Sequence, residues 1–226
     1  MNKKVFISRT KEQSSELEKE LKDVDIDLTS VSLIETKAIP FVLPSENPNW
    51  LFFFSSTAVG AFFSQVDRSL STCKFGAVGP ATARVLSSYV HVSFVGLGSD
   101  TRMIGRQFAA SIGRDRVLVP QSDISRNPLE AILLPGQLDK VVCYTTSPEP
   151  EKIEFADLLI FSSPSNVQSF FLMNSISSKQ KIIAFGPSTT KELADHGIMA
   201  NRELHIIETR EIVRAIMDLL CSSSTD

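Results

Sequence analysis

The sequence is poor in the residues that build metal centres and disulfide frameworks. Only three cysteines and three histidines occur among its 226 residues. Cys73, Cys143 and Cys221 are far apart, and none has the short CxxC spacing of a metal site. Isolated cysteines of this kind are typical of reduced thiols in a cytoplasmic protein. We therefore expect no metal and a cytoplasmic location.

Long apolar runs and an excess of one charge are missing as well. No apolar stretch approaches the ~18 residues that a membrane-spanning helix needs. The apolar stretch near the N-terminus, Val5–Ile7, is too short for the hydrophobic region of a signal peptide. The net charge of −3 gives no general attraction to nucleic acid or to an anionic membrane. We expect neither partner, and an anionic ligand would have to be met by local positive groups.

Several catalytic signatures are absent too. The sequence contains no GxxxxGK[ST] or GxGxxG phosphate-binding motif and no GxSxG nucleophile elbow. A mechanism with a nucleophile and a base therefore has no candidate, which leaves positioning, hydrogen bonding and one general acid. Tyr144, at the end of an expected strand, is the best placed phenol for that acid. The alternative is a half-buried tyrosine that closes the sheet.

What the sequence does contain is an internal duplication. Phe54-Ser55-Ser56 recurs 107 positions later as Phe161-Ser162-Ser163, and Gly79-Pro80 recurs at the same spacing as Gly186-Pro187. The helix between these matches repeats at 108 positions instead. Solenoid repeats are about 20–50 residues long, whereas this repeat has the length of a domain. We therefore expect two similar domains with a cleft between them, which is the default ligand site.

The pattern of apolar residues predicts the α/β class. Short apolar runs alternate with segments of helical period, as in parallel sheets flanked by helices. One expected helix surrounds Leu129–Leu134, and another covers Thr101–Ile112. The expected strands are Val5–Ile7, Val31–Ile34, Leu51–Phe54, Phe75–Val78, Val92–Val95, Val117–Val119, Val141–Tyr144, Leu158–Phe161, Ile182–Phe185 and Leu204–Ile207.

The domain boundary is not expected in the middle of the chain. Each copy needs a strand-helix-strand before its serine cassette, and Val5–Ile34 and Val117–Tyr144 supply one each. Polar, proline-bearing segments follow both and are expected to form a two-stranded linker. The first domain would then be discontinuous, and a simple tandem arrangement is the alternative. The expected divisions are residues 1–35 with 148–226 for domain 1, 39–144 for domain 2, and 36–38 and 145–147 for the linkers.

Hydroxyl groups cluster where expected strands end and helices begin. Open α/β sheets bind ligands at these carboxyl ends, and the unpaired N–H groups of helix N-termini attract anions. The alternative is that the hydroxyls only cap helices and shape turns. The candidate substrate-binding hydroxyls are those of Ser55, Ser56, Thr57, Thr82, Ser162, Ser163, Ser165, Ser188 and Thr189.

Six segments occur in order over nearly the whole chain: Ile7-Ser8-Arg9-Thr10, Phe54-Ser55-Ser56-Thr57-Ala58-Val59, Ala77-Val78-Gly79-Pro80-Ala81-Thr82-Ala83, Cys143-Tyr144-Thr145-Thr146, Phe161-Ser162-Ser163-Pro164-Ser165-Asn166-Val167 and Ala184-Phe185-Gly186-Pro187-Ser188-Thr189. Taken together, these segments resemble the uroporphyrinogen-III synthase family. The resemblance implies two α/β domains joined by a two-stranded linker, and no metal or cofactor. It also implies a reaction in which linear hydroxymethylbilane, a tetrapyrrole with eight carboxylates, loses water and closes into a ring with its terminal pyrrole inverted.

The resemblance also implies roles for individual residues. Tyr144 would assist the loss of hydroxide, and Arg9 would pair with a substrate carboxylate. Thr82 and Thr189 occupy motif positions that face the family's cleft.

The sequence departs from the family pattern after the expected strand Val117–Val119, where an arginine and a glycine are usual. Here the chain has Gln121 and Ser122, with Arg126 further on. Either Arg126 takes over the charge or carboxylate binding on that side is weaker.

The leading interpretation is a cofactor-free lyase and cyclase of tetrapyrrole biosynthesis, a monomer whose partner is a small linear tetrapyrrole polycarboxylate. The main alternative is a two-lobed anion- or tetrapyrrole-binding regulatory module without turnover. The candidate residues Tyr144 and Thr189 favour the enzyme, whereas the missing arginine-glycine pair favours the module. A nucleotide-binding protein is the weakest interpretation, because no phosphate loop occurs.

Overall fold

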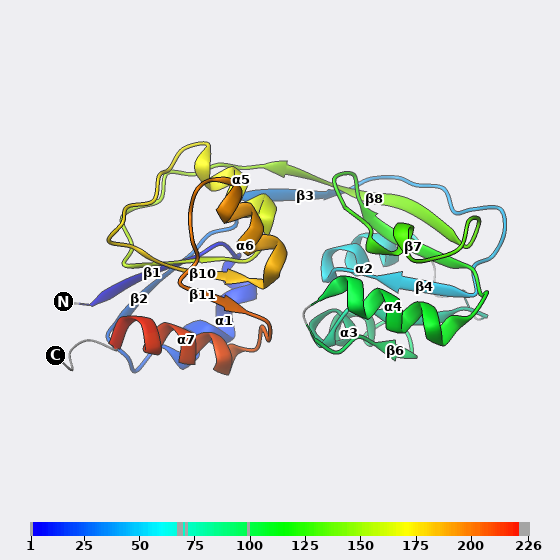
Figure 1. The fold of residues 1–226 in the computed structure, drawn as a ribbon, viewed down its shortest axis with the longest axis horizontal. Helices are drawn as coiled ribbons and strands as arrows, with labels where there is room; N and C mark the ends of the chain where they lie inside the picture. The colour runs from blue at the N-terminus through cyan, green and yellow to red at the C-terminus, as the bar shows by residue number, and fades with distance from the viewer. Residues whose placement is uncertain (1, 67–69, 71, 99, 222–226) are drawn as a thin grey trace. The chain divides into compact units, whose positions relative to one another are not determined.

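The computed structural model describes residues 2–66, 70, 72–98 and 100–221 (Figure 1). The chain divides into two compact units, here called unit 1 (Met1–Glu35 with Ser147–Asp226) and unit 2 (Thr36–Thr146). Each unit is a mainly parallel sheet with helices on both faces, which confirms the predicted fold class. The predicted cleft stays a prediction.

Unit 1 is built on a five-stranded sheet in the order β11-β10-β9-β1-β2, whose strand pairs are parallel. The strands are β1 (Lys3–Ile7), β2 (Ile26–Ser30), β9 (Leu158–Phe161), β10 (Lys181–Phe185) and β11 (Arg202–Leu204). The helices are α1 (Lys11–Glu20), α5 (Pro164–Phe171), α6 (Gly186–Asp195) and α7 (Thr209–Cys221).

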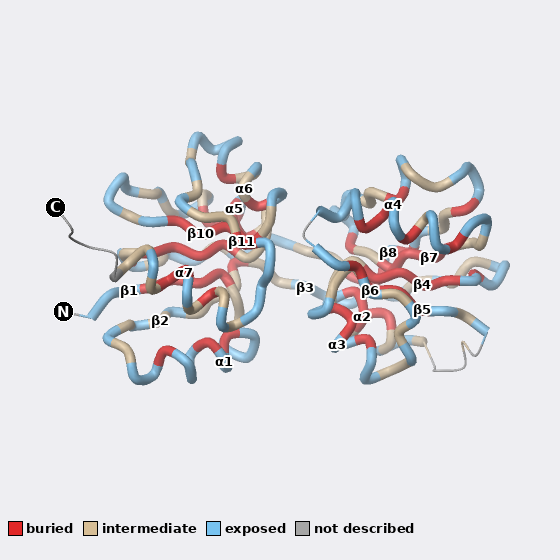
Figure 2. Tube along the Cα trace, turned by 60° about the horizontal axis from the view of Figure 1, so that its bottom comes forward, coloured by how far each residue is buried: buried red, intermediate tan, exposed pale blue. Residues whose placement is uncertain are grey.

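Alternate residues of the central strands of unit 1 enter two separate cores. Val5 and Ile7 pack on the side covered by α1 and α7, whereas Phe6 packs on the side covered by α5 and α6. This follows from the period of two in a strand, which sends successive side chains to opposite faces. Figure 2 shows the buried residues running along the middle strands, with exposed residues on the outer helix faces.

Unit 2 repeats this three-layer plan around a six-stranded sheet in the order β3-β8-β7-β4-β5-β6. Helices α2 and α3 cover one face, and α4 with the short 3-10 helix η1 covers the other. The strands are β3 (Ile34–Ala38), β4 (Trp50–Phe53), β5 (Lys74–Ala77), β6 (Phe94–Val95), β7 (Val117–Ser122) and β8 (Leu138–Pro148). The helices are α2 (Ser56–Phe63), α3 (Pro80–Leu86), α4 (Thr101–Ile112) and η1 (Pro128–Ala131).

The chain passes between the units along β3 and β8, which are neighbours in the sheet of unit 2. The Ile39 amide donates to the Cys143 carbonyl (3.0 Å), and the Glu149 amide donates to the Leu33 carbonyl (2.8 Å). Because the partner numbers run in opposite directions, the two strands are antiparallel. They form the two-stranded linker that the sequence predicts.

The two sheets have the same order when equivalent strands are matched, which confirms the internal duplication. In unit 1, β10-β9-β1 are neighbours in the way that β5-β4-β7 are in unit 2. Leu158 pairs with Lys181 in unit 1, and Trp50 pairs with Lys74 in unit 2. Matching these two pairs places β9 108 positions after its counterpart β4, and β10 107 positions after its counterpart β5. The structural counterpart of Ser55 is therefore Ser163, and the match of Phe54-Ser55-Ser56 to Phe161-Ser162-Ser163 at 107 positions is wrong by one residue.

Several sequence-based elements differ from the structure. The predicted strand Leu204–Ile207 shares only Leu204 with β11, and only Phe94–Val95 of the predicted strand Val92–Val95 form β6. The predicted strand Val31–Ile34 lies largely between β2 and β3, because the half-exposed edge strand β2 alternates apolar residues with Asp27 and Thr29 and has no continuous apolar run. The predicted helix around Leu129–Leu134 is only the short η1. Gly136, at φ 78°, turns the chain into β8 a few residues later.

Cys143 is enclosed in the core of unit 2, and burial raises the pKa of its thiol to about 11. Since the thiolate is the reactive form, we expect iodoacetamide at pH 8 to leave Cys143 unmodified in the folded protein and to alkylate it fully in urea. Peptide mass mapping measures both. Equal rates of modification in the two conditions would show that Cys143 is exposed.

Candidate functional site

The carboxyl ends of β1 and β9 are tied together by two serines. The Ser162 amide donates to the Ser8 hydroxyl oxygen at 2.8 Å, and the Ser162 hydroxyl donates to the Ser8 carbonyl. Ser8 is buried. The predicted site residue Ser162 therefore links the carboxyl ends of β9 and β1 through Ser8, which is 154 positions away. Ser8 is not among the site residues predicted from the sequence.

The buried side-chain amide of Asn166 fixes the start of α5, and Asn166 is also not among the site residues predicted from the sequence. Ser163 caps α5 by accepting from the Asn166 amide (3.3 Å), and the Asn166 side chain donates to the same hydroxyl (2.9 Å). The Asn166 side-chain carbonyl accepts from the Leu33 amide at 2.9 Å. Ser165, one position earlier on α5, is half-buried and makes no side-chain hydrogen bond within the described part of the chain. Ser165 therefore keeps its whole hydroxyl for a ligand, whereas the Ser163 oxygen already accepts two hydrogen bonds.

Arg9 follows the end of β1, with its guanidinium over the ring of Phe185, 4.7 Å from the ring centroid. Burial lowers the pKa of Arg9 from its ordinary value, but a guanidinium stays charged near neutral pH. Over residues 2–66, 70, 72–98 and 100–221, no carboxylate forms an ion pair with it. Arg9 is thus a partly desolvated cation without an anionic partner among the residues that the structure describes.

The first turn of α6 begins immediately after Phe185, at Gly186, whose φ of 77° lies in the left-handed region. Ser188 is exposed in this turn. Thr189 is 1% exposed, and its hydroxyl donates to the Phe185 carbonyl at 2.8 Å. Ser188 can meet a ligand directly, whereas the hydroxyl of Thr189 is already used within its own helix.

We expect Thr189→Val to lower the stability of the protein more than its ligand binding. The substitution removes one buried hydrogen bond, which is worth about 0.5–1.5 kcal/mol of unfolding free energy, and leaves the exposed surface nearly unchanged. Urea unfolding measures the stability, and KM measures the binding. A large rise in KM at unchanged stability would mean that Thr189 turns outward to contact the ligand.

In unit 2, the structure brings Tyr144 and Ser55 together. Their hydroxyl oxygens are 3.2 Å apart, and Ser55 also caps α2 by accepting from the Ala58 amide at 3.0 Å. The Tyr144 ring is packed in the core beneath α2, and the residue is 8% exposed. The phenol is therefore held at the carboxyl end of β4, next to the start of a helix.

The other predicted hydroxyls of unit 2 make no side-chain hydrogen bond among the described residues. Ser56 is half-buried and Thr57 is exposed, both in the first turn of α2. Thr82 lies in the first turn of α3 and is 6% exposed. These three side chains, unlike those of Ser162 and Thr189, retain hydrogen-bonding capacity.

In the segment that departs from the family pattern, the described residues show no positive charge held by an ion pair. The Ser122 hydroxyl bonds that of Ser125 (2.8 Å), and Ser122 pairs with Tyr144 across an irregularity in the strand register. The Gln121 side chain accepts from Asn127 at 3.5 Å. Arg126 is exposed and has no ion pair within the described ranges. The structure therefore shows no cation fixed by an ion pair at the end of β7 among the residues it describes.

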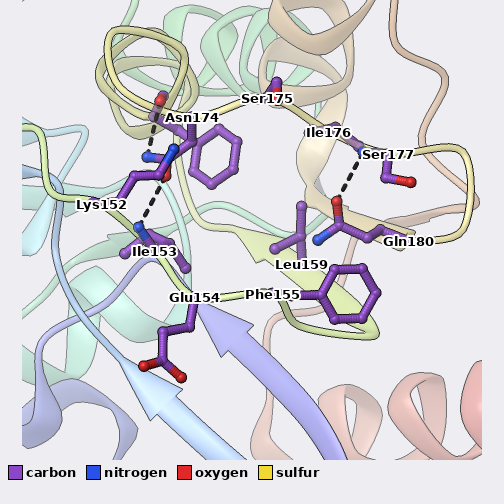
Figure 3. A pocket seen from close by; sticks show the side chains of 11 residues that line it. Lys152, Ile153, Glu154, Phe155, Leu159, Asn174, Ser175, Ile176, Ser177 and Gln180 are labelled. Carbon is purple, nitrogen blue, oxygen red and sulfur yellow. Dashed lines mark hydrogen bonds between the residues drawn. The ribbon is translucent and has the colours of Figure 1, made fainter.

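A pocket of about 300 Å³ lies elsewhere in unit 1, and Figure 3 shows it from close by. Most of its lining comes from the segments that precede β9 and β10, with Leu159 of β9 and Phe170 of α5, so the pocket is near the amino ends of these strands. Hydrogen bonds connect its lining residues. The Ile153 amide donates to the side-chain oxygen of Asn174 (2.9 Å), and the Ser177 amide donates to the side-chain oxygen of Gln180 (2.8 Å). None of the candidate residues lines this pocket.

The chain matches the family model described as uroporphyrinogen-III synthase HemD over residues 15–203. No curated protein sequence matches it. Its fold is similar to that of uroporphyrinogen-III synthetase from Helicobacter pylori, with a TM-score of 0.65, 18% identity, and coverage of 96% of this chain and 100% of the other. A mutant uroporphyrinogen III synthase from Thermus thermophilus gives a TM-score of 0.61 and 13% identity over 97% of this chain and 99% of the other. No helix of the described residues is long and apolar enough to cross a membrane.

Proposed function

This chain belongs to the uroporphyrinogen-III synthase HemD family, and we propose that it converts hydroxymethylbilane to uroporphyrinogen III in tetrapyrrole and haem biosynthesis. The observation that carries the proposal is the family match over residues 15–203, which spans most of the chain. Members of this family are cofactor-free enzymes that release water and close the ring. The sequence reading and the family match therefore agree on the same reaction.

We propose that the two units supply different chemistry to this reaction. Unit 1 offers the cation of Arg9, which suits one of the eight substrate carboxylates, because a charge-assisted hydrogen bond is about twice as strong as a neutral one. Unit 2 offers the phenol of Tyr144, which suits protonation of the departing hydroxyl. The hydroxyls of Ser56, Thr57 and Ser188 would add hydrogen bonds to further carboxylates.

The main task of the protein in this mechanism is orientation. Hydroxymethylbilane loses water readily to an azafulvene, so a strong nucleophile on the protein is not required. The substituted carbon of the last ring must attack before the free carbon does, and holding a flexible chain in one such geometry is worth up to about 7–11 kcal/mol. Exclusion of water would protect the cationic intermediate.

We also propose that the protein works as a monomer in the cytoplasm and binds no nucleic acid. The net charge of −3 and the unpatterned cysteines support this part of the proposal. Size-exclusion chromatography with light scattering measures the oligomeric state, and a dimer would contradict the proposed monomer.

A coupled assay tests the function. Hydroxymethylbilane is generated in place, the protein is added, and type I and type III uroporphyrinogen are separated after oxidation. We expect type III product in proportion to the amount of protein. Only the type I isomer, with the protein shown to be folded by circular dichroism, would mean that ring closure is spontaneous and that the chain binds without turnover.

A further inference from the structure

The Arg9 guanidinium contacts the ring of a buried aromatic residue, Phe185. Phe185 is the last residue of β10, is 4% exposed, and packs in the core beneath α1 and α7. Its ring lies within the ~6 Å range in which a guanidinium is attracted to an aromatic face. No hydrogen bond or ion pair of the Arg9 side chain occurs within the described residues, so this ring is the contact that holds it.

The duplication supplies an internal comparison for this pair. Val5 pairs with Leu158 in unit 1, and Val117 pairs with Trp50 in unit 2, so Val5 and Val117 are equivalent. Arg9 lies four residues after Val5 and Gln121 lies four residues after Val117, so Arg9 corresponds to Gln121. Phe185 corresponds at 107 positions to a smaller residue, Val78, which packs on the equivalent face of unit 2. Both members of the pair therefore differ between the units. Unit 1 has an arginine and an aromatic ring where unit 2 has a glutamine and a valine.

An aromatic ring is thus not required by the fold at this position, since valine occupies it in the equivalent sheet. We infer that Phe185 is a positioning residue, whose ring holds the Arg9 guanidinium at the carboxyl edge of unit 1 for a substrate carboxylate. The binding of a substrate carboxylate by Arg9 rests on the proposed function, whereas the contact between Arg9 and the Phe185 ring is independent of it.

The ring acts by lowering the cost of ordering Arg9. A free arginine side chain has many rotamers and loses this freedom when it binds an anion. A guanidinium already stacked on a ring has lost part of it before the substrate arrives, and it keeps its N–H groups for a carboxylate because stacking uses only the face of the plane. Loss of the ring should therefore weaken substrate binding and leave the chemical step unchanged.

A double-mutant cycle in the coupled assay tests this role. We expect Phe185→Leu to raise KM about three- to tenfold, as befits a partly desolvated cation–π contact, with kcat within about twofold. Phe185→Tyr keeps the ring and should restore the KM. In the Arg9→Gln background, Phe185→Leu should raise KM no further. An equal rise in both backgrounds, or no rise with Arg9 present, would overturn the inference.

A matched control separates positioning from packing. Phe170 on α5 is also buried (2% exposed) and packs against Phe6 and Phe161, outside the contacts of Arg9. Phe170→Leu should lower the melting temperature as Phe185→Leu does, while its KM stays at the wild-type value. A rise in KM of the same size in Phe170→Leu would assign the effect to general loosening of unit 1.

A spectroscopic measurement tests the contact without reference to activity. The side-chain N–H signal of Arg9, assigned by its loss in Arg9→Gln, should be shifted upfield by the ring current of Phe185 in the full-length protein. In Phe185→Leu it should return to the ordinary arginine position, and an unmoved signal would overturn the inference. If the wild-type protein yields no type III product, the proposed function fails, but this signal still decides whether Phe185 holds Arg9.

Discussion

Replacing Tyr144 by phenylalanine is expected to lower kcat by about ten- to a hundredfold and to change KM by less than about twofold. General acids typically contribute about 10²–10⁴ in rate, and an effect at or just below the bottom of that range fits a substrate that already ionises readily. The phenol is held at 3.2 Å from Ser55, and its ring is packed in the core of unit 2. Removal of the hydroxyl alone should therefore leave the site in place.

Ser55→Ala is the matched control, because it removes the partner of Tyr144 and leaves the phenol present. It should lower kcat less than Tyr144→Phe does, and it should lower stability by about 1 kcal/mol through the lost cap of α2. Rates of type III formation under single turnover would separate chemistry from product release. Wild-type turnover in Tyr144→Phe would remove the phenol from the mechanism and leave it a structural residue.

The buried segments were open to prediction from sequence because they are apolar on both faces or have a clear helical period. Leu158–Phe161 is a strand and Thr101–Ile112 a helix over the predicted residues. The edge strand Ile26–Ser30 was missed, because one of its faces is polar and its apolar residues are only half-buried. Prediction thus succeeds where burial leaves a continuous pattern and fails at the edge of the sheet.

The contacts of the site were harder to predict than the fold. Ser162 precedes Ser163, the N-cap of α5, and Asn166 lies in the first turn of that helix, so both suggest local roles at a helix start. Their decisive partners, Ser8 and Leu33, are instead 154 and 133 positions away. Local pattern cannot reveal such a partner. It also cannot show that the hydroxyl of Thr189 is bonded within its own helix. A serine or threonine after a strand therefore predicts a helix start more securely than it predicts a ligand contact.

The two units have the same layers and nearly the same hydroxyl cassettes, yet their cationic and phenolic groups differ. The cation Arg9 has the neutral Gln121 as its counterpart. Tyr144 lies within β8 of unit 2, and the sequence of unit 1 contains no tyrosine. Duplication provided the scaffold twice, and each copy carries one of the two groups. This division makes the contribution of unit 1 measurable on its own.

Arg9→Gln, which gives unit 1 the residue of unit 2, is expected to raise KM about ten- to a hundredfold with kcat within about threefold. A hydrogen bond to a charged group is worth about 1.5–3 kcal/mol, and the half-buried guanidinium has no carboxylate of the described residues to satisfy it. Because the lost interaction is ionic, KM of the wild type should rise with salt more steeply than KM of the variant. The type III fraction at low substrate should fall, since spontaneous closure then competes.

Arg126→Gln decides whether the charge missing after β7 is supplied from further along the chain. Arg126 is exposed, so its loss should change KM by less than about twofold and leave the salt dependence of KM as it is in the wild type. A rise in KM equal to that of Arg9→Gln would mean that unit 2 also binds a carboxylate through a cation. In that case the chemical asymmetry of the two units would be confined to Tyr144, and Arg9 would be one of two equivalent anchors.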